Sequence, residues 1–375
     1  MFARRTAWPR AENALARARR EGPEPRFDLT VSNPTELDLP REDAAILRAL
    51  SDPAALTYAP EPLGLSSARE AVARYYGGKV DPARIVLTAS TSEAYAYALR
   101  LLCDPGDAVA IPRPSYPLFD FLLDLADVAP VPYRLAWDGA WHLDRSSVPD
   151  KVKALFLVSP NNPTGSVLDA DDRAFLLERA RASRTVIVSD EVFADYATTP
   201  ASLIGADQPV ISLSGLSKVA GLPQLKLGWM VINGPDVWAS EAMARLEIIA
   251  DTYLSVSTPV MIALPELLRL AGPWRAGLSA RIAENRAALA RITAGTAVRG
   301  RPSQGGWSAM IDVPRLETDE AWCLRLLAED GVLVQPGYFF DVEEEGCLVL
   351  SLIVPPDLFA EGVRRLVARM GPAHG

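Results

Sequence analysis

The sequence predicts an α/β protein with a large domain, built on a mostly parallel sheet of the seven-stranded type between helices, and a smaller α+β domain. Short, almost continuously apolar runs alternate with helical patterns between about residues 84 and 232. This alternation is typical of parallel strands that are buried on both faces. After about residue 274 the pattern changes to one long helix and a strand–helix–strand series, which indicates a second unit.

The domain boundaries follow from this change of pattern. The chain has 375 residues, of which 49% are apolar, so it is long enough for one large and one smaller domain. We expect an N-terminal arm (1–43) that belongs to the small domain, a large domain (44–273) and a small C-terminal domain (274–375). In the large domain we expect strands over 84–89, 108–112, 152–159, 185–189, 210–213 and 227–232, and helices over 67–76, 92–102, 116–125 and 171–184.

The remaining elements belong to the arm and the small domain. A basic helix is predicted over 8–21, followed by an extended segment over 27–34. The C-terminal part is predicted to contain a helix over 274–291, strands over 306–313, 332–335 and 347–353, and helices over 319–329 and 357–370. The polar residues that directly follow the apolar strands of the large domain are the candidates for function, because open α/β sheets bind ligands at the carboxyl ends of their strands.

Composition excludes several classes of function. The formal net charge of −9 argues against nucleic acid or an anionic membrane as a partner. No uninterrupted apolar stretch of about 18 residues appears, so no membrane span is expected. The first ten residues have no long apolar core after their arginines and do not resemble a signal peptide. Cys103, Cys323 and Cys347 form neither a CxxC pair nor a disulfide framework, which fits a cytoplasmic location.

Histidine usage narrows the chemistry further. The only histidines are His142 and His374, which nearly excludes Ser-His-Asp hydrolysis and histidine-based metal sites. We therefore expect no metal, and we interpret His142 as a strand residue without a catalytic role. The proton shuttle of an enzyme with this sequence must be a lysine, a carboxylate or a tyrosine.

Lys218 is the strongest candidate for a nucleophile. It lies in a glycine-bearing turn directly after the apolar run 210–213, among the small and apolar residues of 214–222. Such surroundings can lower the pKa of an ammonium group and free the amine to attack a carbonyl. The alternative interpretation of Lys218 is an ordinary solvated lysine in a loop. The segments that precede Lys218 in the chain decide between this interpretation and a nucleophile.

Two of those segments suggest a phosphate and a planar ring. The small hydroxyl residues of 88–92 open a helix, where backbone N–H groups and the helix dipole favour an anion. Serine and threonine are also ordinary helix caps, so this signal is weak alone. Tyr116, held between Pro114 and Pro117, could lie flat against a planar ring, with core packing as an equal alternative.

Two further strand ends supply an amide and a carboxylate. Asn161 and Asn162 lie in the proline-braced turn 159–165, which turn chemistry alone would also explain. Asp190 emerges from a buried strand and needs a cationic or hydrogen-bonding partner. A protonated pyridine nitrogen would serve, and the carboxylate would keep that ring protonated. With Lys218, these groups are what pyridoxal phosphate requires for binding as a Schiff base.

The motifs in this order resemble those of the class I/II aminotransferases, which are fold-type I pyridoxal phosphate enzymes. The resemblance is carried by Asn-Asn-Pro-Thr-Gly at 161–165, Asp-Glu-Val-Phe at 190–193, Ser217-Lys218 and Gly228-Trp229. It covers nearly the whole chain, from the Asn-Pro turn at 33–34 to Pro-Gly at 336–337. It implies the fold-type I architecture, pyridoxal phosphate as cofactor and an active site shared within a homodimer.

The resemblance also implies roles for single residues. Lys218 would be the Schiff-base lysine and would move the proton between the substrate's α-carbon and the cofactor. Asp190 would pair with the pyridine nitrogen and Asn162 with the phenolic oxygen, while Tyr116 would stack on the ring. The other implied contacts are Ser90, Thr91 and Ser92 at the phosphate, Ser217 at the cofactor, Tyr58 reaching the neighbouring subunit's phosphate, and Asn33 near the substrate.

Three departures from the family pattern concern the cofactor. Lys226 stands where the family usually has an arginine that grips the phosphate, so a planar fork is replaced by a point charge. Gly215 replaces a serine. Phe193 replaces a tyrosine, which removes one donor to the phenolic oxygen.

The fourth departure concerns the substrate. In the strand over 346–352, Val349 stands where the family's carboxylate-binding arginine usually lies, and valine cannot pair with a carboxylate. Either another cation does so, or the substrate lacks a carboxylate there, or catalysis has decayed. Candidate cations are Arg299, Arg301 and the arginines of the N-terminal helix. Trp307 and the aromatic run 338–340 suggest an aromatic pocket wall, with plain core packing as the alternative.

The sequence therefore predicts a cytoplasmic, homodimeric transaminase of amino acid metabolism that moves an amino group from an amino acid to a 2-oxo acid by a ping-pong mechanism. A pyridoxal phosphate-dependent lyase, decarboxylase or oxidase on a specialised amino acid is the alternative reaction. A non-catalytic binding protein of the same fold is the third hypothesis. The sequence does not name the amino donor or the acceptor.

Overall fold

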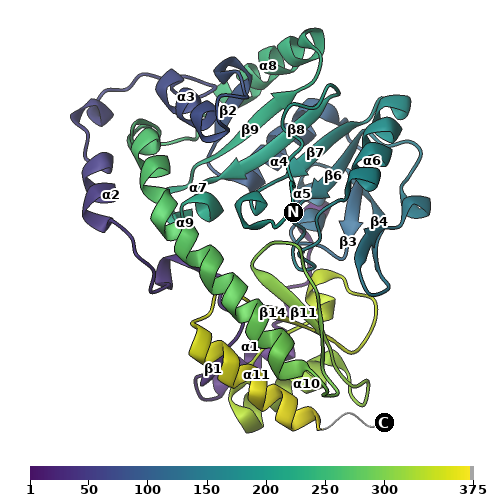
Figure 1. Cartoon of the computed structure of the whole chain (residues 1–375). Helices are drawn as coiled ribbons and strands as arrows, with labels where there is room; N and C mark the ends of the chain where they lie inside the picture. Colours follow the sequence, from purple (N-terminus) through teal and green to yellow (C-terminus); the bar gives the residue numbers. More distant parts are fainter. Residues whose placement is uncertain (372–375) are drawn as a thin grey trace.

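The computed structural model describes residues 1–371, and its largest element is an eight-stranded sheet in the order β2-β9-β8-β7-β6-β3-β4-β5 (Figure 1). Neighbouring strands from β8 to β4 are parallel, while β9 and β5 each run antiparallel to their neighbours. The predicted, mostly parallel sheet is confirmed. The strands are β2 (Ile85–Thr88), β3 (Ala108–Arg113), β4 (Ala129–Trp137), β5 (Trp141–Leu143), β6 (Ala154–Val158), β7 (Val186–Asp190), β8 (Val210–Gly215) and β9 (Gly228–Asn233).

Helices cover both faces of this sheet. One face packs on α4, α5 and α8, and the other on α6, while α3 and α9 pack over the β2–β9 end. Every residue of β6, β8 and β9 is buried, which explains why these strands are continuously apolar in the sequence. These helices are α2 (Asp43–Leu50), α3 (Ser66–Tyr75), α4 (Thr91–Leu102), α5 (Phe119–Leu125), α6 (Ala170–Ser183), α7 (Leu216–Val219), α8 (Asp236–Asp251) and α9 (Thr258–Thr293).

A second, smaller sheet is antiparallel and has the order β10-β11-β14-β13. The N-terminal segment joins this part of the molecule, because β1 (Phe27–Asp28) pairs in parallel with β12 (Val332–Leu333). The small sheet, α10, α11 and the N-terminal segment contribute residues to a separate apolar core. The remaining elements are α1 (Ala14–Glu21), β10 (Arg299–Arg301), β11 (Ser308–Asp312), α10 (Asp319–Arg325), β13 (Gln335–Pro336), β14 (Cys347–Ser351) and α11 (Pro356–Met370).

Helix α9 connects the large sheet to the small one (Figure 1). It is 36 residues long and begins at Thr258, well before the start near residue 274 that the sequence predicts. Pro265 and Pro273 lie inside it. Proline removes a helical hydrogen bond and normally marks a helix end, so the sequence pattern favours a start beyond the second proline. The division at residue 274 therefore stays a prediction about domains and does not coincide with a break in secondary structure.

The remaining findings concern membranes, metals and cysteines. No helix within residues 1–371 has both the length and the apolar character needed to cross a membrane. Over the same range, no three histidine, cysteine or acidic side chains are grouped so that they could hold a metal ion. The three cysteines are free. His142 lies in β5, as predicted for a strand residue, whereas His374 lies outside the described residues.

Candidate active site

A cavity of about 560 Å³ lies between the large sheet and the small sheet. Most of the predicted site residues line it, although they come from distant parts of the chain. Side chains from β11, β13, β14 and the N-terminal segment close its other side. The predicted residues that it brings together are Ser90, Thr91, Ser92, Tyr116, Asn162, Asp190, Phe193, Ser217 and Lys218.

Asp190 and Lys218 meet because their strands are neighbours. Asp190 is the last residue of β7, and Lys218 lies in α7, which follows β8 directly. The two strands are parallel, with Asp190 opposite Leu213. Parallel strands end at the same edge of a sheet, so the carboxylate and the amine both reach the cavity.

The surroundings of Lys218 favour a reactive amine. Its Nζ lies 4.5 Å from the centre of the Trp307 ring and 5.6 Å from that of Phe193. Burial lowers the pKa of Lys218 to about 8, although the nearby Asp190 carboxylate favours the charged form and opposes the change. A substantial share of the amine is therefore neutral at slightly alkaline pH, as a nucleophile or a general base requires.

Asp190 is a buried carboxylate with two hydrogen-bond donors. The backbone N–H of Val192 donates to Oδ1 at 3.1 Å, and the Tyr95 hydroxyl donates to Oδ2 at 3.0 Å. Burial raises the pKa of Asp190 to about 6, because these bonds only partly offset the cost of removing the charge from water. A cationic ring nitrogen at this carboxylate would complete the compensation.

Tyr95 is a site residue that sequence reasoning missed. It lies on α4, one turn after Thr91, and it is buried against Phe119 and Phe156. Residues four apart on a helix share a face. The sequence signal that could have identified Tyr95 is its position on the same helix face as Thr91, at the hydroxyl-rich start of the helix.

The N-terminus of α4 forms an anion site at the cavity wall. Ser90 is the N-cap: its Oγ accepts from the Glu93 N–H at 3.1 Å, and Glu93 accepts in turn from the Ala89 N–H at 2.6 Å. The first-turn N–H groups of Thr91 and Ser92 have no partner within a helix and are available to an anion. Gly228 packs closely against the backbone of this helix start, since a Cβ at Gly228 would lie 3.1 Å from the carbonyl carbon of Ser90.

The paired asparagines have different tasks. Asn161 is buried and holds its own turn, accepting from the Thr164 hydroxyl at 2.9 Å. Asn162 lines the cavity, and its Oδ1 accepts from the Ser308 hydroxyl at 3.1 Å. With its oxygen engaged in this way, the amide nitrogen of Asn162 is the group that can donate to a ligand.

Gly215 has a steric reason to be glycine. A Cβ at this position would lie 2.9 Å from the Cα of Gly228 and 3.0 Å from the carbonyl oxygen of Leu227. Gly215→Ser is therefore expected to destabilise the fold by about 1–3 kcal/mol, because backbone atoms of β9 must move. Urea unfolding measures this, with Gly272→Ser as the matched control, since a Cβ there meets nothing within 4 Å. Equal losses in the two variants would contradict the steric explanation.

Four of the predicted residues lie outside the cavity lining. Lys226 is exposed and has left-handed backbone, directly before Leu227 and Gly228, which do line the cavity. Asn33 caps the short turn Pro34–Glu36 and accepts from the Thr35 N–H at 3.1 Å. Val349 and Tyr58 are the other two.

Val349 is only 2% exposed and packs in an apolar cluster with Met310, Phe340 and Cys347. Of the candidate substitute cations, Arg299 is exposed at the edge of the small sheet. Arg301 is buried, pairs with Asp312 at 2.7 Å and lies near two tryptophan rings. Neither arginine lines the cavity.

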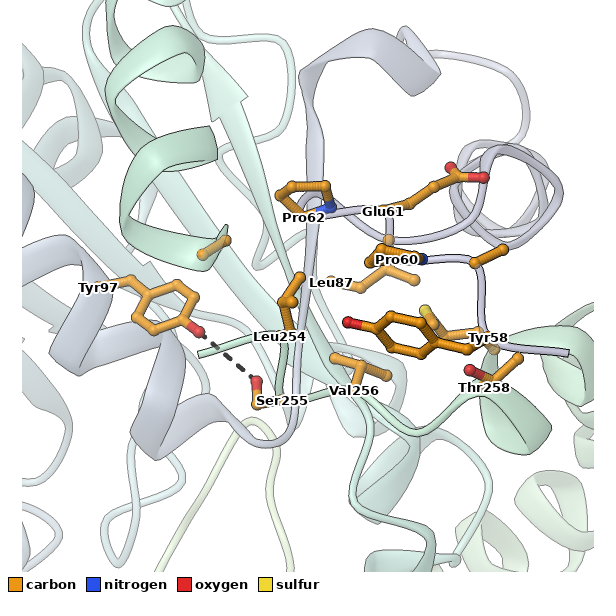
Figure 2. Close-up of a pocket in the computed structure, with 14 residues that line it drawn as sticks. Tyr58, Pro60, Glu61, Pro62, Leu87, Tyr97, Leu254, Ser255, Val256 and Thr258 are labelled. Atoms are coloured by element: carbon orange, nitrogen blue, oxygen red, sulfur yellow. Dashed lines mark hydrogen bonds between the residues drawn. The ribbon is translucent and has the colours of Figure 1, made fainter. Parts of the chain in front are cut away.

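Tyr58 belongs to a second, smaller pocket of about 50 Å³ (Figure 2). Figure 2 shows its ring beside Val256 and Thr258, and the loop that carries Pro60 and Pro62 passes above. The dashed contact in this view joins the hydroxyl groups of Tyr97 and Ser255 at 3.5 Å. Tyr58 is 77% exposed, so most of its surface is open to another molecule.

Comparisons with known proteins agree with this architecture. The family model for aminotransferase class I and II matches residues 25–366. Human tyrosine aminotransferase is 27% identical over 91% of this chain and 80% of its own length. A glutamate-pyruvate aminotransferase of Haemophilus influenzae is 28% identical over 64% of this chain, and the match spans 63% of that relative.

Solved structures give the same fold. An alanine aminotransferase from Pyrococcus furiosus superposes with a TM-score of 0.85 at 24% identity, covering 95% of this chain and 94% of that one. N-succinyldiaminopimelate aminotransferase from Mycobacterium tuberculosis gives 0.77 at 26% identity, with coverage of 91% and 92%. The predicted fold class is confirmed by these superpositions.

Proposed function

Because the chain belongs to the family of class I and II aminotransferases, it is a transaminase, and we propose that it works with pyridoxal phosphate carried on Lys218. The observation that supports this proposal is the meeting of Lys218 and Asp190 in one cavity, beside the N-terminus of α4. The proposed reaction moves an amino group from an amino donor to a 2-oxo acid.

The residues of the cavity fit this cofactor. The N-terminus of α4, with Ser90, Thr91 and Ser92, is suited to the phosphate. We assign Asp190 to the ring nitrogen and the Asn162 amide to the phenolic oxygen. Tyr116 and Phe193 also line the cavity and supply aromatic faces for the ring. Ser217 remains a proposed contact of the cofactor and Lys226 of its phosphate; Lys226 would have to reach inward from its exposed position on a flexible stem.

Lys218 has two tasks in this proposal. When bound, pyridoxal phosphate supplies a carbonyl that takes up the amino group and a protonated ring that accepts electrons from the reacting carbon. Lys218 carries the cofactor before the donor arrives. Its Nζ, when not bonded to the cofactor, would be the base that moves the proton at the substrate's α-carbon. Its lowered pKa suits it to this work near neutral pH.

The distribution of products tests this function. The purified protein, loaded with pyridoxal phosphate, is incubated with an amino donor, with and without a 2-oxo acid. We expect amino transfer that depends on the oxo acid and follows ping-pong kinetics. Stoichiometric release of ammonia or carbon dioxide without an acceptor would instead support the lyase, decarboxylase or oxidase alternative.

We further propose that the protein is a homodimer in which Tyr58 reaches the partner's cavity. Leu254 lines the same pocket as Tyr58, Tyr253 packs against Tyr97 of that pocket, and Leu56 lies two residues before Tyr58 in the chain. All three side chains are exposed. Exposed apolar side chains at and beside one pocket favour a protein interface over open solvent, and we refer to Leu56, Tyr58, Tyr253 and Leu254 as the apolar patch. The apolar patch includes residues of the segment 251–258, which we expect to contribute to the shared site. The free cysteines support a reducing, cytoplasmic location.

Charged substitutions in this patch test the dimer. Leu56 is 91% exposed, so Leu56→Asp combined with Leu254→Asp should leave the protomer folded but place charges in the proposed interface. Light scattering is expected to show a dimer for the natural sequence and a monomer for the double variant. Leu316→Asp, at a 76% exposed position of the small domain, is the matched control and should stay dimeric. A natural protein that is monomeric and fully active would contradict the proposal.

A further inference from the structure

The cavity contains few charges. Among the described residues that line it, Lys218 and Asp190 are the only charged ones. In the proposed function both already have a task, Lys218 with the cofactor's carbonyl and Asp190 with its ring nitrogen. Within residues 1–371, no further cation lines this cavity to pair with a carboxylate of the substrate.

Two arginines of elements next to the cavity, Arg113 and Arg301, are engaged in ion pairs. Arg113 pairs with Asp120 at 2.7 Å and also with Asp341. Arg301 is paired with Asp312 and lies close to the faces of Trp137 and Trp141. Withdrawing either arginine toward the cavity would leave a carboxylate without its partner, which costs free energy.

The side of the cavity formed by the small sheet is apolar and aromatic. Trp307, Phe339, Phe340 and Leu350 line it, and Val349 packs behind Phe340. Three neutral polar side chains, those of Ser308, Gln335 and Ser351, complete this side.

The position of Phe340 is fixed from the large sheet. Its carbonyl oxygen accepts from the Ser115 N–H at 3.0 Å, and the next residue, Asp341, forms the ion pair with Arg113. Arg113 is itself the last residue of β3. The aromatic wall is therefore held in place by two contacts that cross between the sheets.

From this geometry we propose that the site selects its amino donor by an apolar, aromatic body and does not require a carboxylate beside the amino group. A carboxylate against this wall would be a desolvated charge with no partner, whereas an aromatic body would bury apolar surface there. Arylalkylamines are then substrates. The inference rests on the proposed transamination and names the substrate class of that same site.

The proposed reaction is balanced without any further reagent. A donor of the form R–CH₂–NH₂ loses its amino group and leaves as the aldehyde R–CHO. The 2-oxo acid gains the amino group and leaves as the amino acid. One nitrogen and two electrons pass from the donor carbon to the acceptor carbon, and the cofactor is regenerated.

A matched pair of donors tests the inference, since 2-phenylethylamine and phenylalanine differ only in the carboxylate. Single-turnover spectra of the cofactor-loaded protein give a rate constant and an apparent Kd for each donor. We expect 2-phenylethylamine to react at least as efficiently as phenylalanine, and phenylalanine to exceed alanine by at least tenfold. A preference for phenylalanine over 2-phenylethylamine of more than tenfold would overturn the inference while leaving transamination intact. If no donor reacts with the loaded protein, the proposed function fails as well.

A binding measurement checks the same point without catalysis. Calorimetry compares 3-phenylpropanoate with 3-phenylpropanol, which lacks the charge, and the two should bind within about threefold of each other. Gln335, opposite Val349 in the sheet, is the place to add a cation. Gln335→Arg should raise the preference for the carboxylate at least tenfold, whereas Gln335→Met, the neutral control of similar length, should not. Tight, carboxylate-selective binding by the natural protein would overturn the inference.

Discussion

Replacing Lys218 by alanine is expected to abolish transamination, with a loss of roughly 10⁴-fold or more in turnover. The substitution removes both the group that carries the cofactor and the base that moves the substrate proton, and no other lysine lines the cavity. The purified variant should also lack the visible absorbance of the lysine-bound cofactor. Absorption spectra and oxo-acid-dependent amino transfer measure the two effects.

A matched control separates this effect from a general loss of charge. Lys153 is exposed, pairs with Asp107 at 3.5 Å and does not line the cavity. Lys153→Ala should keep the spectrum and the turnover of the natural protein. A Lys218→Ala variant that retains the visible band would show that another residue carries the cofactor.

Asp190→Asn is expected to lower turnover by roughly 10²–10³-fold while stabilising the cofactor-free protein. The side chain keeps its shape but loses the charge that would hold the ring nitrogen protonated. In the absence of the cofactor that same charge is a liability, because its two hydrogen-bond donors and the nearby Lys218 ammonium only partly offset the cost of burying it. Function and stability should therefore change in opposite directions.

The pH dependence follows from the pKa of Asp190, which burial raises from an ordinary value of 3.8 to about 6. Between these two values the folded state holds a proton that the unfolded chain has released, so stability falls as pH rises through this window. The total loss is about 3 kcal/mol, at about 1.4 kcal/mol per pKa unit. Urea unfolding should find cofactor-free Asp190→Asn more stable than the natural protein at pH 7.5 and nearly equal to it at pH 3.5. Equal stability at both pH values would contradict a buried, ionised Asp190.

Much of the fold was predictable because its strands are buried on both faces. Continuous apolar runs marked β6, β7, β8 and β9 directly. The apolar pattern did not predict strand β4, because β4 contains Pro130 and Pro132. Proline lacks a backbone hydrogen-bond donor, which is tolerated near the edge of the sheet, where β4 lies. The start of helix α9 was predicted too late for a related reason. Its internal prolines, Pro265 and Pro273, are residues that normally mark a helix end.

The site was predictable to the extent that strand ends converge. Asp190 and Lys218 meet because β7 and β8 are parallel neighbours, which the alternation of strands and helices implies. The Tyr95–Asp190 hydrogen bond joins residues 95 positions apart and depends on the rotation of α4, which no local pattern specifies. The ion pair between Arg301 and Asp312 likewise depends on the tertiary structure and could not be predicted from the local sequence.

The most direct test of the central claim is to locate the cofactor on the chain. The natural protein, loaded with pyridoxal phosphate, is reduced with borohydride, digested and mapped by mass spectrometry. The chain has only five lysines, at 79, 151, 153, 218 and 226, so the assignment is unambiguous. We predict that the label lies on the peptide that contains Lys218. A label on any other lysine, or a loaded protein that takes up no label, would contradict the account.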